Sequence, residues 1–258
     1  MRFNGKSIVI TGGAGGLGRA FALGFAQEGG NILIADINEE RLAQNASEIN
    51  AVGGGRCETA ICDVTQPQEV EATISRSIAC FGSIDILINN AGGSLGVPKV
   101  PIDQVDEQDW DRVVNLNLKG TFLCTRAAAG HMKKAGRGKI VNLSSITARV
   151  GGQLTPVHYV SAKGAIIAFT RHVAQELGPH GINVNAVAPG IVLSGERLEK
   201  MWYERKTEQE RSDYLKQVPL RRLGSPEEIA QAVLYLSSPA ADLITGVTLD
   251  INGGLFSA

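Results

Sequence analysis

The sequence predicts an α/β fold, a single doubly wound, mostly parallel sheet of seven strands with helices on both faces. Short apolar runs rich in β-branched residues alternate along the chain with longer segments of helical periodicity. This alternation implies crossover connections onto one sheet. Several runs are apolar at consecutive positions, such as "IVI" at 8–10 and "ILI" at 32–34, which is typical of strands covered on both faces.

The expected elements follow from these patterns in chain order. Strands are predicted at Ser7–Thr11, Asn31–Asp36, Glu58–Cys62, Ile84–Asn89, Lys139–Leu143, Ile182–Val187 and Val247–Ile251. Helices are predicted at 17–28, 39–50, 67–81, 106–135, 157–178, 197–217 and 226–237, the last of which begins with a capping box in "SPEE". Because no repeat or Pro/Ser-rich linker interrupts the sequence, residues 1–258 are interpreted as one domain.

Composition narrows the function classes. Hydrophobic content of 43% and a net charge of −1 are ordinary for a globular protein, and give no field that favours nucleic acid or an anionic membrane. The four cysteines, at 57, 62, 80 and 124, lack metal-binding spacing, so free thiols and no metal site are expected. The run "SIVI" at 7–10 is too short for a signal peptide or a membrane span, so a cytoplasmic location is expected.

The turn after the first strand is unusually rich in glycine. Five of the seven residues from Gly12 to Gly18 are glycine, and a helical segment follows. A helix N-terminus presents free N–H groups, and glycine lets the backbone approach a dinucleotide pyrophosphate. The string fits two patterns, G-x-G-x-x-G on residues 13, 15 and 18 and T-G-x-x-x-G-x-G on residues 11, 12, 16 and 18, and a merely tight loop is the alternative.

Asp36 ends the second predicted strand, eighteen positions after Gly18. A carboxylate there can accept hydrogen bonds from the adenosine ribose hydroxyls, although capping of the next helix is an alternative role. The same carboxylate would repel a 2′-phosphate. No Lys or Arg stands at 13–15 or 37 to offset it, and Arg19, the nearby cation, is expected to point away, so NAD is favoured over NADP.

Tyr159 and Lys163 lie four residues apart at the start of a predicted helix, and therefore on one face of it. A phenol with a pKa of about 10 is a poor base at neutral pH. A cation held nearby favours the phenolate and moves its pKa toward working pH, where proton exchange is efficient. Taken alone, Y-x-x-x-K also occurs by chance in many helices.

Seven motifs in order resemble the classical short-chain dehydrogenase/reductases, over nearly the whole chain and to "TGVTLDINGG" at 245–254. They are T-G-x-x-x-G-x-G at 11–18, "DV" at 63–64, "NNAG" at 89–92, the Asn of "NLKG" at 117–120, a Ser of "NLSS" at 142–145, Y-x-x-x-K at 159–163 and "PG" at 189–190. The resemblance favours the second glycine pattern and a Rossmann-type fold.

The resemblance implies roles for individual residues. Tyr159 would be the general acid/base, Lys163 would lower its pKa and bind the nicotinamide ribose, Ser145 would hold the reacting oxygen, and Asn117 would hold a water in the proton path. The spacing from Ser145 to Tyr159 is one residue longer than is usual in the family. Cofactor contacts are expected from Gly12, Gly16, Leu17, Gly18, Asp36, Asp63, Val64, Asn90, Ala91, Gly92, Tyr159, Lys163, Pro189, Gly190, Val192 and Ser194, and substrate contacts from Ser145, Gln153 and Tyr159.

These residues predict an NAD-dependent oxidoreductase that interconverts a secondary alcohol and a ketone, with a small-molecule substrate. One alternative is an NADPH-dependent 3-oxoacyl thioester (acyl-carrier-protein) reductase, because such enzymes share these motifs. Another is an NAD-binding regulatory protein that is catalytically silent. The resemblance further implies a homotetramer, and a substrate lid at about 193–218, where the chain carries a charged insertion.

Overall fold

The computed structural model describes residues 1–151 and 155–257. In this part of the chain, seven strands form one sheet in the order β3-β2-β1-β4-β5-β6-β7, and every neighbouring pair is parallel. The sheet is thus fully parallel, where the sequence predicted a mostly parallel one. The strands are β1 (Ser7–Thr11), β2 (Asn31–Asp36), β3 (Cys57–Ile61), β4 (Ile86–Asn89), β5 (Gly138–Leu143), β6 (Ile182–Pro189) and β7 (Thr248–Ile251).

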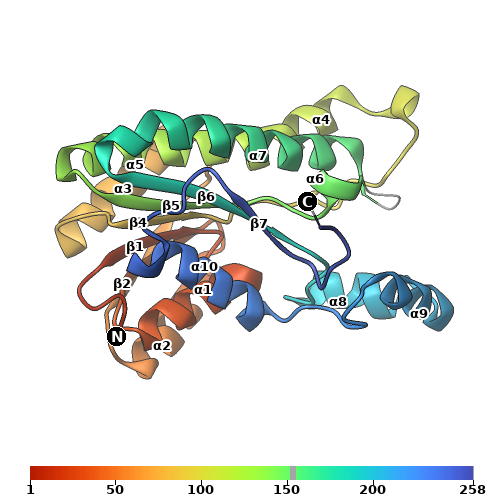
Figure 1. The fold of residues 1–258 in the computed structure, drawn as a ribbon, viewed down its shortest axis with the longest axis horizontal. Helices are drawn as coiled ribbons and strands as arrows, with labels where there is room; N and C mark the ends of the chain where they lie inside the picture. Colours follow the sequence, from red (N-terminus) through yellow and green to blue (C-terminus); the bar gives the residue numbers. More distant parts are fainter. Residues whose placement is uncertain (152–154, 258) are drawn as a thin grey trace.

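Helices cover both faces of the sheet, as the sequence predicted (Figure 1). One layer holds α1 (Gly16–Gln27), α2 (Glu39–Val52) and α10 (Pro226–Ser237). The other holds α3 (Pro67–Phe81), α4 (Glu107–Val114), α5 (Gly120–Ala135) and α7 (Val157–Leu177). Short 3₁₀ turns lie at η1 (Ile102–Gln104), η3 (Gly178–His180) and η4 (Pro239–Ala241).

The consecutive apolar residues of the strands pack alternately into two separate hydrophobic cores, one on each face of the sheet. Ile8 and Ile10 pack with Phe21 and Phe25 of α1 on one face. Val9, between them in sequence, belongs to the cluster on the opposite face. Successive strand side chains point to opposite faces, so a strand buried on both sides needs an unbroken apolar run. Among the helices described, none has the length and apolarity needed to cross a bilayer.

Three helical segments differ from the sequence prediction. The helix predicted at 106–135 is interrupted by a π-helical turn, η2 (Asn115–Lys119). The helix predicted at 197–217 is two helices, α8 (Glu196–Tyr203) and α9 (Glu208–Gln217), because Thr207 and Glu210 form a capping box that starts the second one. A short helix, α6 (Thr147–Val150), follows Ser145.

The strand order reverses between β1 and β4, which lie side by side although β2 and β3 separate them in sequence. In such sheets the crevice beyond the carboxyl ends of the strands, at the point of reversal, is where ligands bind. Helices α8 and α9 lie beyond that end of the sheet (Figure 1).

Candidate active site

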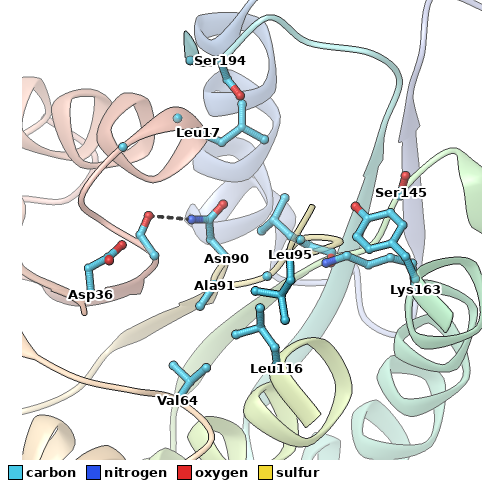
Figure 2. Close-up of a pocket in the computed structure, with 18 of the residues that line it drawn as sticks. Leu17, Asp36, Val64, Asn90, Ala91, Leu95, Leu116, Ser145, Lys163 and Ser194 are labelled. Atoms are coloured by element: carbon cyan, nitrogen blue, oxygen red, sulfur yellow. Dashed lines mark hydrogen bonds between the residues drawn. The ribbon is translucent and has the colours of Figure 1, made fainter. Parts of the chain in front are cut away.

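A cavity of about 1310 Å³ lies at the carboxyl edge of the sheet, and residues that follow six of the strands line it. Its size suffices for a dinucleotide together with a small substrate. Figure 2 shows Asp36 at one end of the cavity and Ser145 with Lys163 at the other. Of the predicted site residues, those that line it are Gly12, Gly16, Leu17, Asp36, Asp63, Val64, Asn90, Ala91, Gly92, Ser145, Tyr159, Lys163, Pro189, Gly190, Val192 and Ser194.

Hydrogen bonds join the glycine turn to the residues that follow β4. Thr11 Oγ1 accepts hydrogen bonds from the backbone N–H groups of Asn90 and Ala91, each over 3.1 Å. Asn90 Nδ2 in turn donates to the carbonyls of Thr11 and Gly12, over 2.9 and 3.0 Å. Figure 2 shows one hydrogen bond from the Asn90 amide. No side chain caps the start of α1, so its first N–H groups face the cavity without a side-chain acceptor, as a bound pyrophosphate requires.

Gly18 does not line the cavity. A β-carbon there would run into the carbonyl oxygen of Gly12 and lie 2.9 Å from Asn90 Nδ2. The structure therefore gives Gly18 a packing role, letting α1 approach the turn, where the sequence predicted a cofactor contact.

The Asp36 carboxylate is oriented by backbone groups. One oxygen accepts from the N–H of Ala14 and the other from the N–H of Asn38, each over 3.1 Å. Asp63, across the cavity, accepts from the N–H and hydroxyl of Thr65. These carboxylates and Val64 form the end of the cavity that suits an adenosine.

Sequence reasoning missed one cation at this end. Arg41 lines the cavity, and its Nη1 lies 3.8 Å from the position that a Gly15 β-carbon would occupy. The expectation that only Arg19 stands nearby is therefore wrong. Arg19 is turned away in an ion pair with Glu48. Arg41 sits five residues after Asp36 in the first turn of α2, and no sequence pattern marks a side chain that folds back across a turn.

Tyr159 and Lys163 come together at the other end of the cavity. Both are in the first two turns of α7, and Lys163 Nζ lies 5.6 Å from the centroid of the Tyr159 ring. Lys163 is buried, and Nζ donates a 2.6 Å hydrogen bond to the carbonyl of Leu143 at the end of β5. Burial lowers the pKa of Lys163 to about 8, because desolvation disfavours the ammonium form.

Ser145 follows β5 and lines the same part of the cavity. Its Oγ accepts hydrogen bonds from the N–H and the hydroxyl of Thr147, over 3.3 and 3.1 Å. An oxygen that accepts from both groups has its own proton to donate into the cavity. The neighbouring Ser144 is engaged elsewhere, donating to the carbonyl of Lys163 over 2.8 Å. Gln153 lies outside the described residues.

Asn117 lies behind the cavity wall, in the π-helical turn, and is fully buried. Its Oδ1 accepts from the N–H of Gly93, and its Nδ2 donates to the carbonyls of Gly93 and Val113. A β-carbon on Gly92 would lie 2.5 Å from Asn117 Oδ1 and 3.2 Å from Lys163 Nζ. Gly92 thus separates the Asn117 amide from the Lys163 ammonium, and only a glycine leaves both in place.

The segment that follows β6 lines the remaining side of the cavity. The Ser194 carbonyl and hydroxyl lie 3.2 and 3.5 Å from the position of a Gly16 β-carbon, so this segment rests on the glycine turn. Met201 of α8 lines the cavity, whereas the adjacent Trp202 is buried and packs edge-to-face on Tyr214 of α9. Across the described residues, no group of His, Cys, Asp and Glu side chains is arranged to hold a metal ion.

Comparisons with known proteins agree with this geometry. A family model described as enoyl-(acyl carrier protein) reductase matches residues 12–256. The chain is 36% identical over 255 residues to 3-oxoacyl-(acyl-carrier-protein) reductase FabG of Thermotoga maritima, covering 99% of both chains. It is 38% identical over 254 residues to the (2S)-((R)-hydroxy(phenyl)methyl)succinyl-CoA dehydrogenase subunit BbsD of Thauera aromatica, covering 98% of both.

Among solved structures, an NAD⁺-bound xylitol dehydrogenase superimposes with a TM-score of 0.91 at 33% identity, over 98% of this chain and 100% of that one. The full-length matches, the parallel sheet and the order of the motifs agree with one another. The chain belongs to the short-chain dehydrogenase/reductase family and is an oxidoreductase.

Proposed function

We propose that this protein is an NAD-dependent dehydrogenase that interconverts a secondary alcohol and a ketone. One observation carries the proposal: Ser145, Tyr159 and Lys163 line the same cavity as the glycine turn and Asp36. A dinucleotide whose adenosine lies at Asp36 and whose pyrophosphate lies at α1 would extend toward Ser145 and Lys163 (Figure 2).

The chemistry divides between the cofactor and the chain. When bound, the nicotinamide supplies or accepts the hydride. Tyr159 exchanges the proton of the substrate hydroxyl or carbonyl, and the ammonium of Lys163 stabilises its phenolate form. Ser145 donates a hydrogen bond to the reacting oxygen. Asn117 fixes the cavity wall at Gly93, beside the path by which a proton reaches Lys163.

Substitution of Tyr159 tests this assignment. Tyr159→Phe keeps the ring and removes the proton-exchanging hydroxyl, so turnover should fall by about 10³-fold or more while NAD affinity changes little. A panel of secondary alcohols and sugar alcohols, followed by absorbance of the reduced nicotinamide, provides the assay. Substantial turnover by Tyr159→Phe would contradict the catalytic role. Tight NAD binding without turnover on any substrate would support a catalytically silent protein.

A second candidate function is reduction of a 3-oxoacyl thioester with NADPH. The likeness to FabG and the description of the matching family model favour it. Acetoacetyl-CoA assayed beside the alcohol panel, with each reduced cofactor, separates the two functions. A kcat/KM for the thioester at least a hundredfold above that for any simple ketone would replace the first proposal with this one.

The assembly we propose is a cytoplasmic homotetramer. In support, α4 and α5 carry the large apolar side chains Trp110 and Phe122 at 37% and 42% exposure, and the edge strand β7 carries Leu249 at 37%. Light scattering on the purified protein tests this. We also propose that residues 193–218 form the substrate lid, because Met201 lines the cavity.

A further inference from the structure

Arg41 supplies a positive charge where the sequence around the glycine turn carries none. It lines the adenosine end of the cavity together with Asp36 and Asn38, and its guanidinium lies across Gly15, with Nη1 3.8 Å from the site of a β-carbon. A lysine or arginine at position 15 would begin at that β-carbon, close to where the Arg41 guanidinium lies. Arg41 thus places a guanidinium, from α2, beside the turn that holds the phosphates.

The neighbouring charges leave this guanidinium available for a ligand. Within residues 1–151 and 155–257, Arg41 has no side-chain hydrogen bond or ion pair. The Asp36 carboxylate is already oriented by the N–H groups of Ala14 and Asn38. Glu196 of the lid is the other anion nearby: its pKa is lowered chiefly by the hydrogen bond from Lys200, and in smaller part by the charge of Arg41.

A ribose between Asp36 and Arg41 would meet one anion and one cation. Asp36 accepts hydrogen bonds from free ribose hydroxyls and repels a 2′-phosphate. A guanidinium binds phosphate through charge-assisted and often bidentate hydrogen bonds. Because the guanidinium stands beside Gly15 and reaches the cavity, it offsets the repulsion that the carboxylate would impose on a phosphorylated ribose.

We infer that Arg41 binds the 2′-phosphate of an NADP-type dinucleotide, so that this site accepts NADP(H) as well as NAD(H). The inference deepens the proposed function, since it rests on the use of a nicotinamide dinucleotide at this cavity. Asp36 keeps the site open to the unphosphorylated ribose, and Arg41 makes the phosphorylated one acceptable.

Nucleotide fragments test the inference without any turnover. Adenosine 2′,5′-bisphosphate and adenosine 5′-monophosphate differ only in the 2′-phosphate, and calorimetry gives the affinity of each. We expect Arg41→Gln to weaken the bisphosphate by about tenfold and the monophosphate by less than about twofold. Arg19→Gln is the matched control, because it removes the same charge from a side chain paired with Glu48 outside the cavity, and it should change neither affinity.

Two outcomes would overturn the inference. In one, Arg41→Gln weakens both fragments equally, which would assign Arg41 to the shared 5′-phosphate. In the other, it weakens neither. If the enzyme proves active, the kcat/KM ratio of NADPH to NADH should also fall about tenfold in Arg41→Gln and stay unchanged in Arg19→Gln. An enzyme without dehydrogenase activity would refute the proposed function, while the fragment affinities would still decide the role of Arg41.

Discussion

Arg149 and Asp250 form an ion pair that joins the segment after Ser145 to the last strand of the sheet. Arg149 Nε lies 3.1 Å from Asp250 Oδ1, and the two side chains are only 14% and 16% exposed. The guanidinium also lies over the ring of Phe256, 5.4 Å from its centroid. Helix α6 is therefore held against β7 and the C-terminal segment, and Ser145 directly precedes this anchored stretch.

Removing Arg149 should destabilise the protein. We expect Arg149→Ala to lower the free energy of unfolding by about 2 to 3 kcal/mol, because Asp250 stays largely buried without its partner. Urea denaturation measures the change. The exposed pair Lys133–Glu176 provides the control, and Lys133→Ala should cost less than about 1 kcal/mol. Equal losses in the two variants would show that burial of the Arg149 pair makes no difference.

A methyl group at position 92 should disable the site while the fold persists. The β-carbon of Gly92→Ala would displace the Asn117 amide or the Lys163 ammonium, so kcat should fall by about 100-fold. Gly130→Ala is the matched control, since a β-carbon at that exposed position inside α5 meets no atom within 4 Å. Circular dichroism checks the fold of both, and a fully active Gly92→Ala would refute this packing argument.

The pKa of Lys163 predicts the alkaline limit of activity. Because burial lowers this pKa to about 8, the ammonium that stabilises the Tyr159 phenolate is lost in the free enzyme as the pH rises through about 8. We therefore expect kcat/KM for ketone reduction to decline above pH 8, since that parameter reports the free enzyme. In Lys163→Arg, the guanidinium stays charged, and the decline in the residual activity should move to higher pH. An unmoved decline would assign it to another group.

Asp85 should contribute stability that depends on pH. Burial alone would raise the pKa of this carboxyl, but hydrogen bonds from the Ser7 N–H, Ser83 and Arg137, and the charge of Lys6, lower it below 3.8. Since the folded pKa lies below the unfolded one, the stabilisation is complete above about pH 4 and is lost as the pH falls through the folded value.

Asp85→Asn tests this dependence, and should cost about 1 to 3 kcal/mol at pH 7 because the buried Ser7 N–H loses a charged acceptor. The difference from the parent protein in urea midpoints should shrink in acid. A difference in urea midpoint that is constant from pH 7 to pH 3 would show that the charge of Asp85 does not stabilise the amino ends of β1 and β4.

The central strands β1, β2 and β4 were predictable because each carries an unbroken apolar run that serves two cores. Across the whole sheet, the observed bounds of β1 and β2 match the predicted ones, and those of the other five strands differ by one or two residues at one or both ends. The motifs that follow the strands meet in one cavity. The break between α8 and α9 also had a readable signal, since Thr207 and Glu210 stand at capping-box spacing.

Other features depend on contacts between distant segments, and the sequence does not reveal them. The π-helical turn places Asn117 against Gly93, which is 24 residues earlier in the chain. Arg41 reaches the cavity by folding across Gly15, and Gly18 is buried against Gly12. In each case the tertiary neighbour, and not the residue's own motif, decides what the side chain does.

The π-helical turn also restricts how the length of this protein can change. The N–H of Gly120 bonds the carbonyl of Asn115, so this turn holds one residue more than an α-helical one. Deleting any single residue from 115–119 would restore an ordinary α-helical turn and keep the helix beyond it in phase, but it would move Asn117 away from the position at which it bonds Gly93 and Val113. A one-codon deletion there would be more damaging than the same deletion in a surface loop.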